Sequence, residues 1–326
     1  MLFKNFKNKL LMILFTTIFI IPLTVYGYSE NIVLGGENVG IEVKSTGVLI
    51  VGFYNVENTS PGIEAGLKIG DIITKVDDTV IKGITDLSNN FSNKQTIEIT
   101  YKRRGEEKKT KLNLIKDDGS YKTGLYVKDS ISGIGTLTFI DPSNDRFGAL
   151  GHEILEQTTR VKFEIKEGKI FESKVTSIEK GKRGEVGEKN AIYNSNQIYG
   201  IIDKNDETGI YGDYKKTYNK QNTIKVSEDI KIGNAKILTV IDKSEKRYFD
   251  IKILNIDKDH KTKNILFEVT DKELLEKGNG IVQGMSGSPI IQEDNLVGAV
   301  THVVVDNPHK GYGILIKNML KESEGG

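Results

Sequence analysis

The chain contains no cysteine and no tryptophan, and only 5 of its 326 residues are proline. Without cysteine, the protein has no disulfide, no thiolate metal site and no cysteine nucleophile. The 46 basic and 45 acidic side chains leave a net charge of +1, which argues against a general nucleic-acid-binding protein. Only four histidines are present, so we expect any acid–base chemistry near neutral pH to use one of them.

A long apolar run occurs only at the N-terminus. Lys4, Lys7 and Lys9 precede an uncharged, almost wholly apolar stretch over residues 10–25. A basic segment followed by an apolar one is typical of export signals. We interpret residues 1–27 as a signal peptide or an N-terminal membrane anchor, and either places the remainder of the chain across a membrane.

Residues 28–44 are rich in glycine and polar side chains, and we interpret them as a linker or a short lead-in strand. The next segment has the sequence S-P-G-I-E-A-G-L-K-I-G-D-I-I at 60–73, which predicts a turn, a very short helix and a strand. An amphipathic helix and a β-hairpin are expected to follow, ending near residue 114. This order resembles a PDZ domain of the kind found in HtrA and tail-specific proteases, and we assign it to residues 45–116.

The PDZ resemblance implies a site for an extended peptide, because such domains add a peptide strand to the edge of their sheet. The bound segment would be a peptide end of a substrate or a part of this chain itself. An alternative is that the glycines of the expected binding loop only form turns. The residues that we assign to this loop are Gly47, Val48, Leu49, Ile50, Val51 and Gly52.

Beyond a polar break at 117–120, short strand-like segments with turn signals between them continue almost to the C-terminus. Many short strands over about 200 residues favour an all-β barrel or a double barrel. We therefore predict a mainly β protein, with a second domain over residues 119–326.

The segment G-M-S-G-S-P-I-I at 284–291 carries the strongest chemical signal. A nucleophilic serine needs an exposed hydroxyl on a tight turn and backbone N–H groups directed at the developing oxyanion. The chymotrypsin pattern places the nucleophile between glycines before an apolar strand, and Ser286 occupies that position here. Gly284 and Ser286 would supply the oxyanion-hole N–H groups. Ser288 is the weaker nucleophile candidate, and a simple Gly/Ser-rich turn is the alternative.

A serine nucleophile needs a base, and His152 is our candidate because it ends a strand of small and apolar residues. His302 ends the strand that follows Ser286 and could also point toward the site, but its alternation with valines favours a half-buried structural role. His260 and His309 lie in turns and are expected to be solvated.

A third group that orients the histidine is not fixed by spacing. Asp203, Asp213 and Asp271 all remain open. Asp271 stands at an expected helix start, where a capping role competes with a catalytic one.

The segments around His152 and Ser286, together with G-A-V-T-H-V at 298–303, resemble the SpoIVB peptidase family of endospore-forming bacteria. The resemblance covers essentially the whole chain and implies a PDZ domain followed by a chymotrypsin-like double β-barrel serine endopeptidase. It places the catalytic histidine on His152, the serine on Ser286 and the acid on Asp271, and it implies no metal or cofactor.

The resemblance further implies a role in sporulation signalling, in the intermembrane space between forespore and mother cell. Members cleave themselves and a membrane-bound regulator, stage IV sporulation protein FA, which triggers processing of pro-sigma-K. Two alternatives remain: a secreted PDZ adaptor without catalytic activity, and a general envelope protease for damaged proteins.

Overall fold

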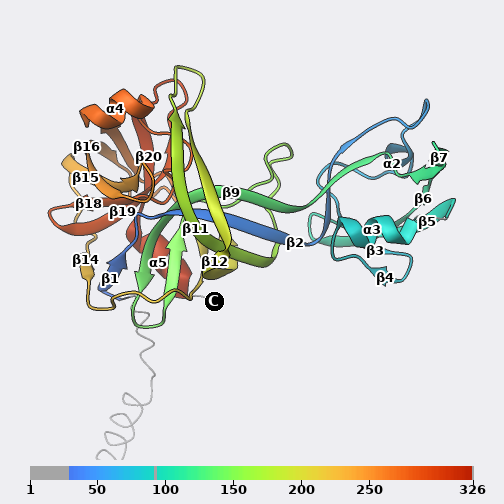
Figure 1. Ribbon diagram of the computed structural model, residues 1–326, viewed down its shortest axis with the longest axis horizontal. Helices are drawn as coiled ribbons and strands as arrows, with labels where there is room; N and C mark the ends of the chain where they lie inside the picture. Colours follow the sequence, from blue (N-terminus) through green and yellow to red (C-terminus); the bar gives the residue numbers. More distant parts are fainter. Residues whose placement is uncertain (1–28, 92–93, 325–326) are drawn as a thin grey trace, which may run out of the picture.

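The computed structural model describes residues 29–91 and 94–324, so the predicted export segment at 1–27 lies outside the described residues. Two bodies make up this part of the chain, and two long strands run between them (Figure 1). These strands are β2 (Asn38–Phe53) and β9 (Leu125–Asp141). We call the body that contains most of the chain the large domain and the other the PDZ domain. Among the described residues, no helix has the length and apolar character needed to cross a membrane.

The PDZ domain consists of the second half of β2, the first residues of β9 and the elements between them. A short helix follows the Ser-Pro turn, and a second helix precedes the hairpin, as the sequence predicts. The intervening elements are α2 (Pro61–Glu64), β3 (Ile72–Val76), β4 (Thr79–Val80), α3 (Ile84–Phe91), β5 (Thr96–Arg103), β6 (Glu106–Asn113), β7 (Ile115–Asp117) and β8 (Ser120–Lys122).

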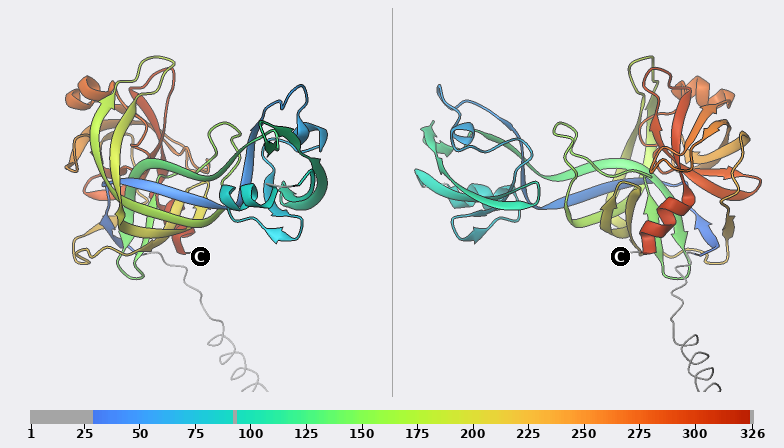
Figure 2. Two further views of the ribbon diagram at one scale, coloured as in Figure 1. Left: turned by 45° about the vertical axis from the view of Figure 1, so that its right-hand side comes forward. Right: turned by 180° about the vertical axis from the view of Figure 1, so that it is seen from behind.

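The large domain is built almost entirely of strands, as predicted. Its two helices lie at its surface, and α5 is next to the C-terminus in both views of Figure 2. Besides the remaining parts of β2 and β9, its elements are β1 (Asn31–Leu34), β10 (Arg146–Ala149), β11 (Ile165–Glu179), β12 (Glu188–Asp206), β13 (Gly209–Tyr214), β14 (Thr223–Val226), β15 (Gly233–Val240), β16 (Lys246–Ile256), β17 (Ile265–Val269), α4 (Lys272–Gly278), β18 (Pro289–Gln292), β19 (Asn295–Val303), β20 (Lys310–Leu315) and α5 (Ile316–Glu324).

The strands of the large domain pair in two rings, each around its own apolar core. One ring runs β2-β9-β10-β13-β12-β11 and the other β15-β16-β17-β20-β19-β18. One core is centred on β15, β16 and β17 and contains Phe249 and Phe267. The other gathers side chains of β2, β10 and β11, including Phe147. A smaller cluster around Tyr211 and Met319 seats helix α5. Two cores in one strand-rich domain agree with the predicted double-barrel architecture.

Of the two interpretations of residues 28–44, a linker or a short lead-in strand, the structure shows strands. Strand β1 pairs with β14 and β9, and the first half of β2 pairs with β9 and β11. Val39, Ile41 and Val43 alternate along β2 and are all buried in the large domain. The period-two alternation of these three residues is a strand signal that the neighbouring glycines obscured.

The Gly-Asp pair of the PDZ motif has a structural role. Asp71 is buried and accepts two hydrogen bonds from Arg103, at 2.7 Å each, in a two-pronged ion pair. It also accepts a bond from the Lys68 N–H at 2.8 Å. The carboxylate thereby fixes the turn that leads into β3 against strand β5.

We expect Asp71→Asn to lower the free energy of unfolding of the PDZ domain by about 2 kcal/mol, because the buried amide that replaces the carboxylate cannot accept both hydrogen bonds from the guanidinium group of Arg103. Urea denaturation followed by hydrogen exchange in β3 and β5 measures this loss. Glu106→Gln is the matched control, since Glu106 forms only an exposed ion pair with Lys108. Equal unfolding midpoints for the two variants would contradict the assignment.

Candidate active site

The nucleophile loop, residues 283–288, connects α4 to β18 through two glycines with positive φ. Gly284 has φ +91° and Gly287 has φ +93°, in the left-handed region that favours glycine. A Cβ at Gly287 would stand 2.1 Å from the Thr136 carbonyl oxygen, so no other residue fits there. The glycines therefore form the tight turn that the motif predicts.

Strand β9 holds the nucleophile loop in place. The Thr136 N–H donates to the Ser286 carbonyl at 2.9 Å, and the Thr138 hydroxyl donates to the Gly287 carbonyl at 2.7 Å. Ser288 is fully buried beside Thr136 and does not line the pocket described next. Of the two serines in the motif, Ser286 is thus the one open to a substrate.

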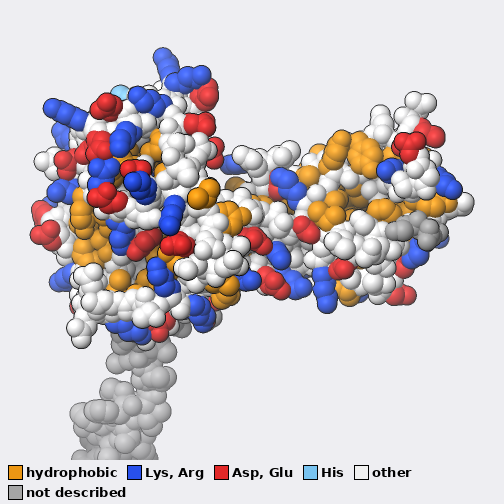
Figure 3. Space-filling model, viewed as in Figure 1, with side chains coloured by type: hydrophobic (Ala, Val, Ile, Leu, Met, Phe, Trp, Pro, Cys, Tyr) orange, Lys and Arg blue, Asp and Glu red, His pale blue; other side chains and the backbone are white. Residues whose placement is uncertain are grey.

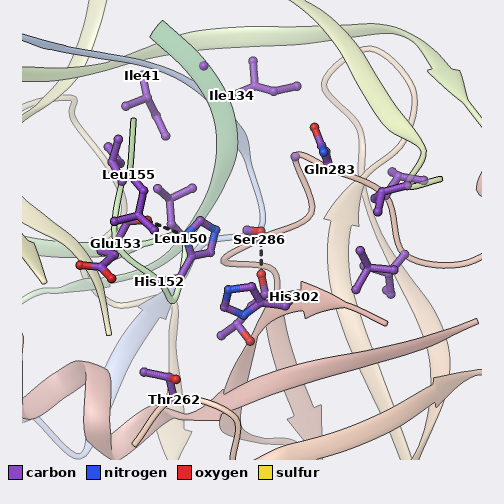
Figure 4. Close-up of a pocket in the computed structure, with 18 of the residues that line it drawn as sticks. Ile41, Ile134, Leu150, His152, Glu153, Leu155, Thr262, Gln283, Ser286 and His302 are labelled. Carbon is purple, nitrogen blue, oxygen red and sulfur yellow. Dashed lines mark hydrogen bonds between the residues drawn. The ribbon is translucent and has the colours of Figure 1, made fainter. Parts of the chain in front are cut away.

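Ser286 and His152 line one pocket of about 700 Å³ in the large domain. Figure 4 shows their side chains and that of His302 converging on one region of its wall. The rings of His152 and His302 have centroids 5.1 Å apart. The Ser286 hydroxyl donates to the Thr301 carbonyl at 2.9 Å in this structure. Folding thus brings together the two residues that the sequence assigned to nucleophile and base.

The ring of His152 is oriented by a backbone carbonyl. Its Nδ1 lies 2.8 Å from the Glu153 carbonyl oxygen, which accepts only if Nδ1 carries the proton. The other ring nitrogen, Nε2, is then the unprotonated one and can accept a proton from serine. Burial lowers the pKa of His152 from its ordinary value, and the nearby cation of Arg160 lowers it further, against the opposing effect of the Glu153 carbonyl.

The prediction that Asp271 orients His152 is wrong in this geometry. Asp271 is the N-cap of α4, where its side chain accepts from the Leu274 N–H at 3.0 Å, and it lies outside the pocket. Asp203 and Asp213 instead pair with Arg146. Within the described ranges, no carboxylate forms a hydrogen bond or ion pair with His152. The capping reading of Asp271, left open by the sequence, is the one that the structure shows.

The half-buried structural role favoured for His302 is wrong, and the structure shows the alternative, in which His302 points toward the site. Its side chain is exposed and lines the pocket next to His152. Desolvation by the pocket wall, together with His152, lowers the pKa of His302 to about 4. His302 is therefore neutral at pH 7 and belongs to the surface that a substrate contacts.

The two N–H groups assigned to the oxyanion hole are available for a ligand. Among the described residues, neither the N–H of Gly284 nor that of Ser286 has a hydrogen-bond acceptor, whereas the Met285 and Gly287 N–H groups both have one. Buried backbone donors are normally satisfied, so a free pair beside a candidate nucleophile fits an anion-receiving role.

The peptide-binding loop predicted at Gly47–Gly52 is wrong, because this segment of β2 has no free edge. It pairs with β3 on one side and with residues 125–128 of β9 on the other. Within the described part of the PDZ domain, no strand pairs with the outer edge of β9 at these residues. Helix α3 lies close to that edge, where the Ile84 N–H donates to Asp129 at 2.9 Å. The open edge of the PDZ sheet is therefore that of β9 at residues 125–128, and not that of β2 as predicted.

Comparisons with known proteins agree with this description. The SpoIVB peptidase S55 family model matches residues 119–320, and a PDZ domain model matches residues 38–114. The serine protease Do-like HtrA of Lactococcus lactis (strain IL1403) is 37% identical over 83 residues; this match covers 24% of the chain and 19% of the relative. The chain thus spans about a fifth of that relative's length.

Two solved structures are similar to parts of the chain. The PDZ domain of the SdrC-like protein from Listeria monocytogenes is 23% identical, with a TM-score of 0.22, covering 26% of this chain and 90% of that one. The Rv3671c protease from M. tuberculosis, in its active form, is 15% identical, with a TM-score of 0.30, covering 58% of this chain and 71% of that one.

The chain consists of a PDZ domain and a strand-rich domain in which a serine and a histidine line one pocket, the arrangement expected of a serine peptidase. The family model extends over more than half of the residues and includes both His152 and Ser286. The chain belongs to the SpoIVB peptidase S55 family.

Asp271→Ala tests the capping role of Asp271. We expect a loss of about 1 kcal/mol in the free energy of unfolding, from the missing cap, and an unchanged kcat/KM. Ser286→Ala, assayed alongside, should lose at least about 10³-fold in kcat. A folded Asp271→Ala protein with a loss as large as that of Ser286→Ala would restore Asp271 as the third catalytic residue.

The lowered pKa of His152 predicts the pH dependence of cleavage. The base works only when neutral, so activity is lost as the pH falls through the pKa of His152. Because that pKa lies below the ordinary value of about 6.5, the acid limb of kcat/KM should have its midpoint below pH 6.5. A midpoint at or above pH 7 would show that a carboxylate supports the imidazolium during catalysis.

Proposed function

We propose that this chain is a serine endopeptidase of sporulation signalling that cleaves itself and a membrane-bound regulator similar to stage IV sporulation protein FA. This cleavage would trigger processing of pro-sigma-K. The supporting observation is a SpoIVB peptidase family match that contains a serine and a histidine facing one pocket. The predicted export segment at 1–27 would place the enzyme in the intermembrane space between forespore and mother cell.

The proposed reaction is acyl transfer at a peptide bond. Rotation of the Ser286 side chain redirects its hydroxyl group from the Thr301 carbonyl to Nε2 of His152. His152 then takes the hydroxyl proton while the serine oxygen attacks the peptide carbonyl. The oxyanion is received by the N–H groups of Gly284 and Ser286. His152 then donates the proton to the leaving amine, and water hydrolyses the acyl-enzyme. No metal or cofactor takes part in these steps.

The PDZ domain would bring the substrate to the pocket. An extended peptide end, from the regulator or from this chain, adds to the open edge of β9 beside α3. The same strand continues into the large domain and reaches the nucleophile loop at Thr136. Acidic and basic side chains are interspersed over the visible face of the large domain, so this face presents no field of one sign to a substrate (Figure 3).

Purified wild-type protein and Ser286→Ala, incubated alone and with the regulator, test the proposal. Mass spectrometry should find defined fragments of both proteins with wild type and none with Ser286→Ala. A fluorophosphonate should label wild type at Ser286. An unlabelled wild-type protein would instead favour the inactive adaptor, and broad degradation of unfolded proteins would favour the quality-control protease.

Ile84→Glu tests the PDZ edge, because Ile84 lies exposed at the start of α3 beside β9. We expect at least a fivefold weaker affinity for a peptide carrying the C-terminus of a self-cleavage fragment, measured by fluorescence anisotropy. Ile63→Glu is the control, since Ile63 is an exposed isoleucine on α2. Equal affinities for the two variants would move the binding site elsewhere.

A further inference from the structure

A buried lysine lies behind the nucleophile loop. Lys189, at the start of β12, is only 1% exposed. In the described ranges, no carboxylate pairs with it, and its ammonium group has two neutral hydrogen-bond partners. Burial alone lowers the pKa of Lys189 to about 7. Such burial destabilises the fold, and a methionine of similar volume would avoid that cost.

The contacts of Lys189 converge on Gly284. Its Nζ donates to the Gly284 carbonyl at 3.3 Å and to the Thr239 hydroxyl at 3.0 Å. Its backbone N–H donates to the Gln283 carbonyl at 3.0 Å. Its stem also packs on the glycine, because Cδ lies 3.2 Å from where a Cβ of Gly284 would stand. Lys189 thus binds the peptide groups on both sides of the Gly284 α-carbon.

The bond from the Lys189 backbone N–H to the Gln283 carbonyl decides where the Gly284 N–H points. The bond from the ammonium group to the Gly284 carbonyl holds the next peptide group, so that both sides of the glycine are fixed. In a trans peptide the C=O and N–H groups point in opposite directions. The Gln283 carbonyl faces β12, so the Gly284 N–H faces away from it. Gly284 lacks a side chain, so without an anchor its flanking peptides could turn. Thr136 supplies a second anchor, since its hydroxyl also donates to the Gly284 carbonyl, at 2.9 Å.

We propose that Lys189 is a positioning residue that, together with Thr136, locks the Gly284 peptide so that its N–H is held ready for the oxyanion. This proposal rests on the assignment of Ser286 as nucleophile and Gly284 as an oxyanion-hole donor. Lys189 does not touch the substrate; it acts through the carbonyl groups of Gln283 and Gly284.

Lys189→Met tests the proposal in the full chain. With a peptide spanning the self-cleavage site as substrate, kcat should fall about 10- to 100-fold, somewhat less than the loss of a whole oxyanion donor, while KM changes less than threefold. The fluorophosphonate should label Ser286 more slowly by a similar factor, because its phosphoryl oxygen occupies the oxyanion hole.

Thr239→Val is the matched control, because it removes the other partner of the ammonium group and leaves the bond to Gly284. It should keep kcat within threefold of wild type. A folded Lys189→Met protein with wild-type kcat, or a Thr239→Val protein that loses as much as Lys189→Met, would overturn the proposal. If wild type itself is not labelled at Ser286, the proposed function fails instead.

The melting temperature separates positioning from simple support of the fold. The unfolded chain keeps the lysine proton up to pH about 10.4, whereas the folded protein releases it near pH 7. Wild type therefore gains stability relative to Lys189→Met as the pH rises from 7 to 10, and Lys189→Met should melt no lower than wild type at pH 7. A structural role only would be shown by a Lys189→Met protein that melts below wild type at pH 7 and whose kcat and KM both change by a similar factor.

Should Lys189→Met fail to fold, Thr136→Val provides the decisive measurement. It removes the other donor to the Gly284 carbonyl and leaves Lys189 in place. We expect the same pattern of reduced kcat, slower labelling and nearly constant KM. An unchanged kcat would show that anchoring of this carbonyl does not prepare the oxyanion hole.

Discussion

The hydrogen bonds between β9 and the nucleophile loop are the constraint on which the site depends. Thr136 and Thr138 hold the carbonyls of Ser286, Gly284 and Gly287, which fixes a turn that glycine alone would leave mobile. The same strand begins as the open edge of the PDZ domain. The loop that follows His152 is attached to it as well, because Lys128 donates to the buried Glu156 at 2.6 Å. One strand therefore connects the peptide edge, the histidine loop and the serine loop.

The chemistry of the pocket differs from that of a triad in one respect. A backbone carbonyl, rather than a carboxylate, fixes the ring of His152. A carbonyl can set the tautomer, but it stabilises the imidazolium less than a full negative charge does. Arg160 and the neutral His302 nearby add nothing that favours the charged form. Much of the rate enhancement would then depend on the oxyanion hole, which gives the anchoring of Gly284 by Lys189 its importance.

Prediction succeeded where the signal is local and failed where it depends on distant partners. The elements of the PDZ domain and the nucleophile loop around Ser286 follow from turn residues and strand periodicity, which neighbouring residues determine. The family resemblance assigned the catalytic acid to Asp271, but the carboxylate of this residue caps the helix that it precedes. Gly47–Gly52 is a strand, as its apolar run indicates, yet residues 125–128 occupy the edge that a peptide would need. His302 lies in a predicted strand, but whether its side chain faces the pocket depends on the segments that fold next to that strand.

The sequence by itself determined the strand-rich class, the order of elements in the PDZ domain, the nucleophile motif and the absence of cysteine chemistry, because each depends only on residue type and on short spacings along the chain. Only the tertiary structure decided that His302 joins His152 and Ser286 in the pocket, which strand edge stays open and what lies behind Gly284. Those outcomes depend on pairing between segments far apart in the chain, such as β2 with β9 and β12 with the nucleophile loop. Lys189 shows the difference most clearly: nothing near it in the sequence marks it, and burial against Gly284 gives it a role.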